Sequence, residues 1–140
     1  MYSSTIFKIR PIEPKILPLV NELNKTGILE TISSCQGHFK GTDQKIDDRN
    51  FADVRFLKLS EVPEKRIEVL LNFIFNEFHQ LDNPIHLDAY KKYTGSEPRY
   101  VVMLKPKDRF DHPSQKRKDV DAAILIATKM VADAIERKIF

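Results

Sequence analysis

The chain has 140 residues, of which 41% are hydrophobic and 31% are charged. These values are typical of one globular domain over residues 1–140, and they exclude a disordered or collagen-like chain. No apolar run reaches the roughly 18–20 residues that a membrane-spanning helix needs, so we expect no membrane association. Lys and Arg number 23 against 20 Asp and Glu, and a net charge of +3 does not by itself identify a nucleic-acid partner.

The cysteine content and the N-terminal sequence bear on the compartment. Cys35 is the one cysteine, so no disulfide can form within the chain, and a free thiol is typical of a reducing compartment. The run 1–8 lacks the basic and long apolar regions of a signal peptide. We therefore expect a cytoplasmic protein, while the oligomeric state has no signature in the sequence.

The hydrophobic pattern predicts three helices and four strands. Apolar residues recur every three or four positions in the helical segments, and β-branched and apolar residues dominate the strands. The predicted elements, in chain order, are a helix over 15–26, strands over 28–34 and 51–59, a helix over 63–80, strands over 85–93 and 99–105, and a helix over 114–138.

The element order α-β-β-α-β-β-α predicts an α+β fold, in which helices cover one face of an antiparallel sheet of about four strands. Such a sheet can leave its other face open to water or to a ligand. Alternation along two strands places a polar set on that open face: Asp53, Arg55, His86, Asp88 and Tyr90. This set is either a polar ligand platform or a solvated face whose charge pairs contribute a few tenths of a kcal/mol each.

The most distinctive run is Ser33-Ser34-Cys35-Gln36-Gly37-His38, where the first strand ends and a polar loop over 35–50 begins. Hydroxyl side chains followed by glycine can present donors to an anion. An imidazole near neutral pH is a general acid or base, or a ligand, and a thiol is a nucleophile when its pKa is lowered. The alternative is structural: a small buried thiol at a strand end and a turn glycine.

Two further groups of residues are candidates for a binding site. A zinc site built from Cys35, His38 and His86 is one hypothesis, but the sequence holds no second cysteine pair, and we assign no metal ligand. The segment 105–118 is basic, and its Lys116 and Arg117 lie near the start of the last predicted helix. A helix start flanked by cations attracts phosphate, although a solvated basic face has the same composition.

The run 33–38 resembles the Ser-Ser-Cys-Ser-Gly-Arg run of the small wybutosine-synthesising tRNA methyltransferase family, which lacks a Rossmann domain. The match covers positions 33–37, and the order of elements is similar over most of the chain. The resemblance implies a related fold and S-adenosylmethionine-dependent methylation of a modified tRNA guanosine. Gln36 and His38 replace the family's Ser and Arg, and an imidazole does not reproduce the phosphate-binding fork of a guanidinium.

Two classes of function follow from these observations. In the first, the run 33–38 and the open face form one site for a nucleotide, S-adenosylmethionine, RNA or another small anionic ligand. If the protein is an enzyme, the candidate catalytic residues are His38 as the acid or base, Cys35, and His86 with Asp88, which orients it. In the second class, the protein is a non-enzymatic module that binds protein or nucleic acid, and a zinc protein is a third hypothesis. The anion-binding residues of the first class are Ser33, Ser34, Gly37 and Arg55.

Overall fold

The computed structural model describes residues 11–41, 50–95 and 97–140. Within these residues the element order is the predicted α-β-β-α-β-β-α, and every predicted boundary lies within two residues of the observed one. The N-terminal run 1–8 and the loop residues 42–49, which entered the sequence interpretation, lie outside the described residues. The elements are α1 (Leu17–Asn24), β1 (Leu29–Cys35), β2 (Ala52–Lys58), α2 (Glu64–His79), β3 (Ile85–Thr94), β4 (Glu97–Pro106) and α3 (Pro113–Glu136).

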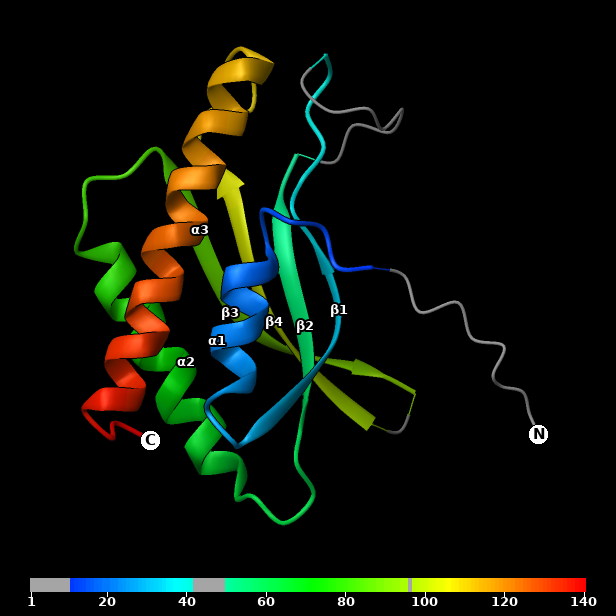
Figure 1. Cartoon of the computed structure of the whole chain (residues 1–140), viewed down its shortest axis with the longest axis vertical. Helices are drawn as coiled ribbons and strands as arrows, with labels where there is room; N and C mark the ends of the chain where they lie inside the picture. The colour runs from blue at the N-terminus through cyan, green and yellow to red at the C-terminus, as the bar shows by residue number, and fades with distance from the viewer. Residues whose placement is uncertain (1–10, 42–49, 96) are drawn as a thin grey trace.

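The four strands form one antiparallel sheet in the order β1-β2-β4-β3. All three helices lie against the same face of this sheet, as Figure 1 shows. The predicted α+β class, with helices on one side of an antiparallel sheet, is therefore confirmed. Among the described residues, no helix combines the length and the apolar character needed to cross a bilayer.

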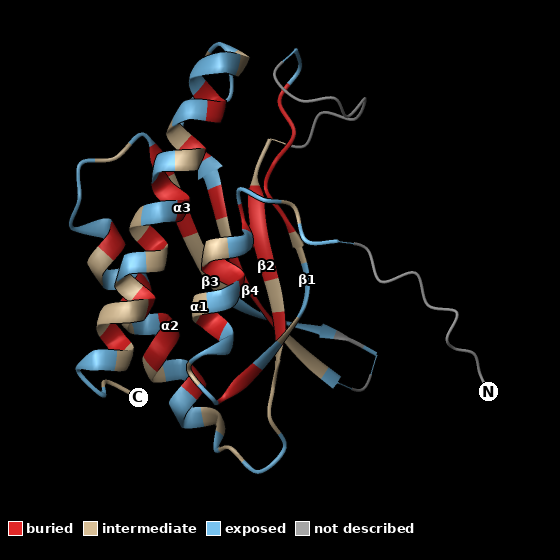
Figure 2. Cartoon of the chain, viewed as in Figure 1, coloured by how far each residue is buried: buried red, intermediate tan, exposed pale blue. Residues whose placement is uncertain are grey.

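The hydrophobic core lies between the sheet and the helices. Buried residues line the inner helix faces and the strand positions that point toward them (Figure 2). Ala123, Ala127 and Ala134 are fully buried on α3, and their small side chains let this helix lie close to its neighbours. From β2 the core takes Val54 and Phe56, whose aromatic ring stacks on Tyr100 of β4. Burying such side chains stabilises the fold by roughly 1.5–3 kcal/mol each.

The β3–β4 hairpin is tighter than the sequence indicated. Its connection was predicted over 94–98, but Thr94 pairs with Glu97, so both strands continue almost to the turn. Gly95 has a φ of +70°, the left-handed conformation that short hairpin turns require and that glycine adopts without steric cost.

A β-bulge in β1 decides which side chains of this strand face away from the helices. Thr31 pairs with Phe56, yet Ser33 pairs with Arg55, so one extra residue lies between them on β1. Side chains alternate along a strand, and an extra residue reverses the faces of all that follow. Ser33 and Cys35 therefore lie on the face opposite the helices, together with Arg55.

A polar cluster ties the start of α2 to the sheet. The Tyr100 hydroxyl donates to the Glu64 carboxylate, and Lys91, which pairs with Tyr100 across β3 and β4, forms an ion pair with the same carboxylate. Lys91 and then Tyr100 hold the pKa of Glu64 below its ordinary value of 4.5. Burial and the bond to Glu64 raise the pKa of Tyr100 to about 12.

The cluster predicts an acid-sensitive contribution to stability. A carboxyl whose folded pKa is depressed stabilises the protein above its unfolded pKa and loses that contribution as the pH falls through the folded value. We expect Glu64→Gln to lower the free energy of unfolding at pH 7 and the difference from the wild type to vanish as the pH falls below 4.5. Urea unfolding at a series of pH values measures this, with Glu68→Gln, exposed on the same helix, as control. A difference that stays constant down to pH 2 contradicts the assignment.

Candidate functional site

The corner that follows β1 is buried and held by an arginine from the last helix. Residues 35–39 are all buried. Arg117 of α3 donates from its two terminal nitrogens to the backbone carbonyls of Gln36 and Gly37, each at 2.7 Å. Its Nε donates to Asp121 at 2.9 Å, and its guanidinium lies 5.1 Å from the centre of the Phe39 ring. The corner is thus fixed from the helix side by charge-assisted hydrogen bonds.

Gly37 is required at its position for two reasons. Its φ is +88°, and a Cβ there would lie 3.1 Å from the Phe39 ring and 3.2 Å from the carbonyl oxygen of Phe51. Its amide donates to the Cys35 sulfur at 3.4 Å. Gly37 was predicted to help hold an anionic ligand; instead its carbonyl accepts from Arg117 and its amide contacts the thiol.

Glu13, just before α1, completes the site, and the sequence interpretation did not include it. One carboxylate oxygen of Glu13 accepts a hydrogen bond from the backbone amide of Gln36 at 3.0 Å, and the other lies 3.2 Å from Nε2 of His38. The side-chain oxygen of Gln36 accepts in turn from the Lys15 amide at 2.9 Å. Glu13 lies 22 positions before Cys35 in a short Pro-Ile-Glu-Pro run, so only the tertiary structure brings it to the corner.

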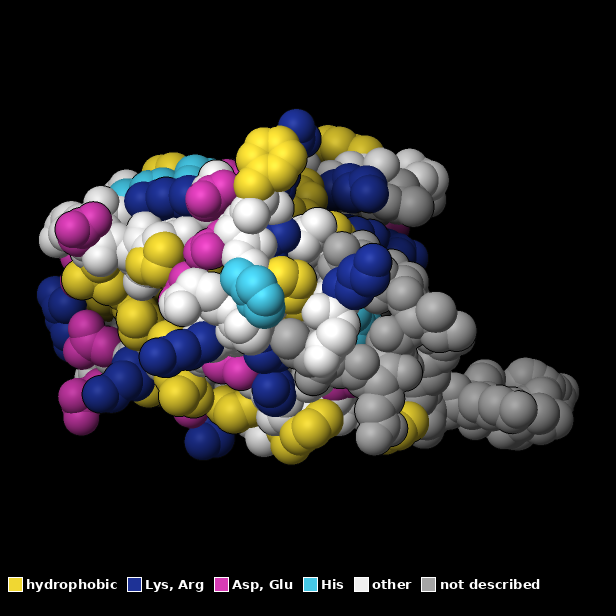
Figure 3. Space-filling model, turned by 90° about the horizontal axis from the view of Figure 1, so that it is seen from above, with side chains coloured by type: hydrophobic (Ala, Val, Ile, Leu, Met, Phe, Trp, Pro, Cys, Tyr) yellow, Lys and Arg dark blue, Asp and Glu magenta, His cyan; other side chains and the backbone are white. Residues whose placement is uncertain are grey.

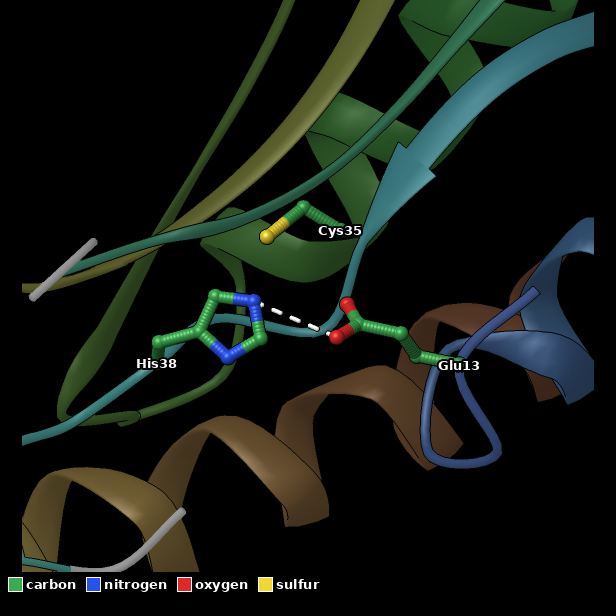
Figure 4. Close-up of side chains that lie close together, drawn as sticks. All are labelled: Glu13, Cys35 and His38. Atoms are coloured by element: carbon green, nitrogen blue, oxygen red, sulfur yellow. Dashed lines mark ion pairs between the residues drawn. The ribbon is translucent and has the colours of Figure 1, made fainter. Parts of the chain in front are cut away.

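Glu13, Cys35 and His38 form a compact cluster of three ligand-type side chains. One atom from each, the carboxylate oxygen, the sulfur and an imidazole nitrogen, lies within 4.8 Å of the other two. Figure 4 shows the sulfur and the carboxylate on the same side of the imidazole, both toward Nε2. The other ring nitrogen, Nδ1, is buried and has no hydrogen-bond partner among the described residues.

This arrangement favours metal binding over a nucleophile–base relay. In a Cys–His–acid relay, the acid holds one imidazole nitrogen while the thiol contacts the other. Here the acid and the thiol converge on the same nitrogen. Around tetrahedral zinc, bond lengths of about 2.0–2.3 Å place neighbouring ligand atoms about 3.3–3.8 Å apart. The observed 3.2 Å between Glu13 and His38 is close to that spacing.

The structure does not bring His86 and Asp88 to the corner. Nε2 of His86 lies 3.1 Å from Asp88, but both residues are on β3, at the opposite edge of the sheet from β1. Because β2 and β4 lie between, the Cys35 and Asp88 backbones are about 14 Å apart at the usual strand spacing. A pocket uniting His38 with His86 and Asp88 is therefore not formed, and the hypothesis of a Cys35–His38–His86 zinc site is wrong in its third ligand.

The other predicted residues divide between the two faces of the sheet. Ser33 is exposed and Arg55 is one-third exposed on the face opposite the helices, where they pair across β1 and β2. Asp53 is buried, not part of a solvated platform, and accepts from Nε of Arg55 at 3.2 Å. Ser34 pairs with Val54, which places it on the helix side. Tyr90 is exposed on β3, in register with Val101 of β4.

Lys116 and Arg117 do not form the predicted phosphate site at the start of α3. Both are buried, because their charges are used inside the protein. Lys116 donates to the Arg109 carbonyl and to the Asn50 side chain, while Arg117 holds the corner. Seen from above, this end of the molecule shows basic side chains scattered among acidic and hydrophobic ones (Figure 3).

Comparison of the chain with protein-family models, curated protein sequences and solved structures finds no match. The resemblance of the run 33–38 to the wybutosine-synthesising methyltransferase family therefore stays a prediction.

Removing the Arg117 contacts is expected to destabilise the fold. Arg117→Met leaves two buried carbonyls without their donor and leaves Asp121 with Lys15 as its remaining cation, at a cost of about 2–4 kcal/mol. Arg109→Met, at an exposed arginine that stacks on the exposed Phe110, is expected to cost less than about 0.5 kcal/mol. Urea unfolding measures both, and equal losses in the two variants contradict the assigned role.

Gly37→Ala is expected to cost more than an alanine at another left-handed glycine. The left-handed conformation alone costs an L residue about 1–2 kcal/mol, and that is the full loss expected for Gly27→Ala, where a Cβ meets nothing within 4 Å. At Gly37 the contacts with Phe39 and the Phe51 carbonyl add to this loss. Urea unfolding compares the two variants; an equal loss shows that the corner relaxes freely.

Proposed function

We propose that the protein binds one zinc ion through Glu13, Cys35 and His38. The observation that carries this proposal is the convergence of a carboxylate oxygen, a sulfur and an imidazole nitrogen within 4.8 Å in a largely buried setting. This mixture of oxygen, sulfur and nitrogen donors suits zinc better than magnesium or calcium, which prefer oxygen ligands alone. The proposal differs from the sequence-based prediction, which assigned no metal ligand.

The number of ligands supports a reactive site more than a structural one. Structural zinc has four protein ligands, whereas catalytic zinc keeps three and leaves the fourth position to water or substrate. Three ligand-type residues meet here among the described residues. Zinc in such a site lowers the pKa of bound water and polarises a bound carbonyl or phosphoryl oxygen.

Backbone hydrogen bonds position two of the three candidate ligands. The backbone amide of Gly37 donates to the Cys35 sulfur. The backbone amide of Gln36 orients the Glu13 carboxylate and leaves its second oxygen toward His38. Nδ1 of His38 has no hydrogen-bond partner among the described residues.

The nucleotide, S-adenosylmethionine and RNA hypotheses, and the link to tRNA methylation, stay predictions. They are tested with the same protein by a thermal-shift screen with and without zinc. A shift produced by S-adenosylmethionine that Cys35→Ser abolishes favours the resemblance.

Zinc titration of metal-free protein tests the proposed function. We expect one zinc per chain, and each of Cys35→Ser, His38→Ala and Glu13→Gln should weaken binding at least about 100-fold, since each removes one of three ligands. His86→Ala is the matched control, because it removes an imidazole next to a carboxylate at the far edge of the sheet. Circular dichroism checks that each variant is folded. Wild-type protein that binds no zinc, or loses it equally with His86→Ala, contradicts the proposal.

A further inference from the structure

Arg55 lies on the face of the sheet opposite the helices, near the cluster of Cys35, His38 and Glu13, and its guanidinium has donors that no described residue engages. Arg55 is fixed through Nε by the buried Asp53 carboxylate, and no other side-chain contact engages it among the described residues. Its two terminal nitrogens are therefore available, on a side chain that is one-third exposed. A guanidinium held in this way is oriented in advance for the two-pronged binding of a carboxylate or phosphate.

The β1 bulge places Ser33 and Cys35 on the same face of the sheet as Arg55. Cys35 pairs with Asp53 and Ser33 with Arg55, so four side chains form two adjacent rows on the face opposite the helices. Ser33 and Cys35 are two residues apart on one strand, about 7 Å along the chain. Ser33 is exposed and brings a hydroxyl donor beside the guanidinium.

The charges of the two groups also suit an anion. A zinc ion with a glutamate and a thiolate is neutral, since two negative ligands offset its two positive charges. Arg55 brings a positive charge to the same face of the sheet. An anion at this place gains both the open metal position of the proposed zinc site and directed hydrogen bonds.

We infer that Ser33 and Arg55 form an oxyanion subsite of the metal centre, for a ligand whose carboxylate or phosphate group lies between the guanidinium and the open metal position. This inference rests on the proposed zinc site and adds the chemical class of its ligand. It gives Asp53 a positioning role, because the carboxylate holds Arg55 and does not contact the ligand.

Spectroscopy of the cobalt-loaded protein tests the inference. Co²⁺ replaces Zn²⁺, and its sulfur-to-metal charge-transfer and d–d absorption bands report coordination by Cys35 and a change at the open position. Inorganic phosphate and acetate are titrated separately, so that the two sources of an oxyanion are distinguished. We expect one of them to change the d–d bands saturably, and Arg55→Gln to raise its half-saturating concentration at least about tenfold. Ser33→Ala is expected to raise it by a smaller factor.

Lys92→Gln is the matched control. It removes one positive charge from the same face of the sheet, but on β3, at the edge away from Cys35. It should leave both metal and anion binding unchanged. Equal weakening by Arg55→Gln and Lys92→Gln shows general charge attraction and overturns the subsite, as does the absence of any spectral change with either anion.

The two proposals fail in different ways. If Cys35→Ser retains full metal affinity, the zinc site itself is wrong and the subsite falls with it. If metal binding depends on Cys35 while anion binding is insensitive to Arg55, only the subsite is wrong. Asp53→Asn supplies a further readout: a positioning residue should weaken anion binding while leaving the charge-transfer band in place.

Discussion

The candidate site depends on the fork of hydrogen bonds from Arg117 to the carbonyls of Gln36 and Gly37. These bonds belong to a closed ring of contacts. Arg117 pairs with Asp121, Asp121 pairs with Lys15, and the Lys15 amide donates to the Gln36 side chain, which returns the ring to the corner. The ring joins three segments that are far apart in sequence: the stretch before α1, the corner after β1, and the first turns of α3. These contacts bring Glu13 to within 3.2 Å of His38.

A buried guanidinium is a costly way to join segments, because the cation loses its hydration and recovers that energy only through well-directed partners. Apolar residues of similar size would join the same elements, but they would not fix the direction of two peptide carbonyls. Direction matters here, since the carbonyls belong to the residues between Cys35 and His38 and so set the angle at which these two side chains leave the chain. We therefore assign the arrangement to specificity of the corner geometry and expect its contribution to net stability to be modest for the number of bonds involved.

The fold was predictable because the hydrophobic periodicity and the order of the elements determine it. The site depends on the strand order in the sheet, the β1 bulge and tertiary hydrogen bonds, which the sequence pattern does not show. Alternation placed Arg55 and Asp88 on the face opposite the helices, because β2 and β3 are regular in that region, whereas the His86 ring lies 5.1 Å from the ring of His79 at the end of α2. It could not show that β4 inserts between them, nor that a bulge in β1 turns Cys35 to the same face. Counting charges predicted that Lys116 and Arg117 would attract phosphate, but their acceptors are a side-chain amide, the Asp121 carboxylate and three backbone carbonyls, and sequence composition does not show such partners. Glu13 has no local signal at all, because its role is created by the ring of contacts around Arg117.

The contacts that hold the corner also bear on the kind of metal site that it can form. Where a metal organises its own ligands, binding and folding are one event, and four closed ligands are the usual result. Here polar contacts that do not involve the three ligand atoms already hold the corner, and the sheet register already sets Cys35 beside Asp53 and Arg55. In the proposed zinc site, the three ligands found among the described residues would leave one position of the metal for an exchangeable partner. An arginine oriented by a buried carboxylate, beside such a position, is more simply explained by a ligand that binds both than by the stability of an exposed sheet face, where a charge pair contributes less than about 1 kcal/mol.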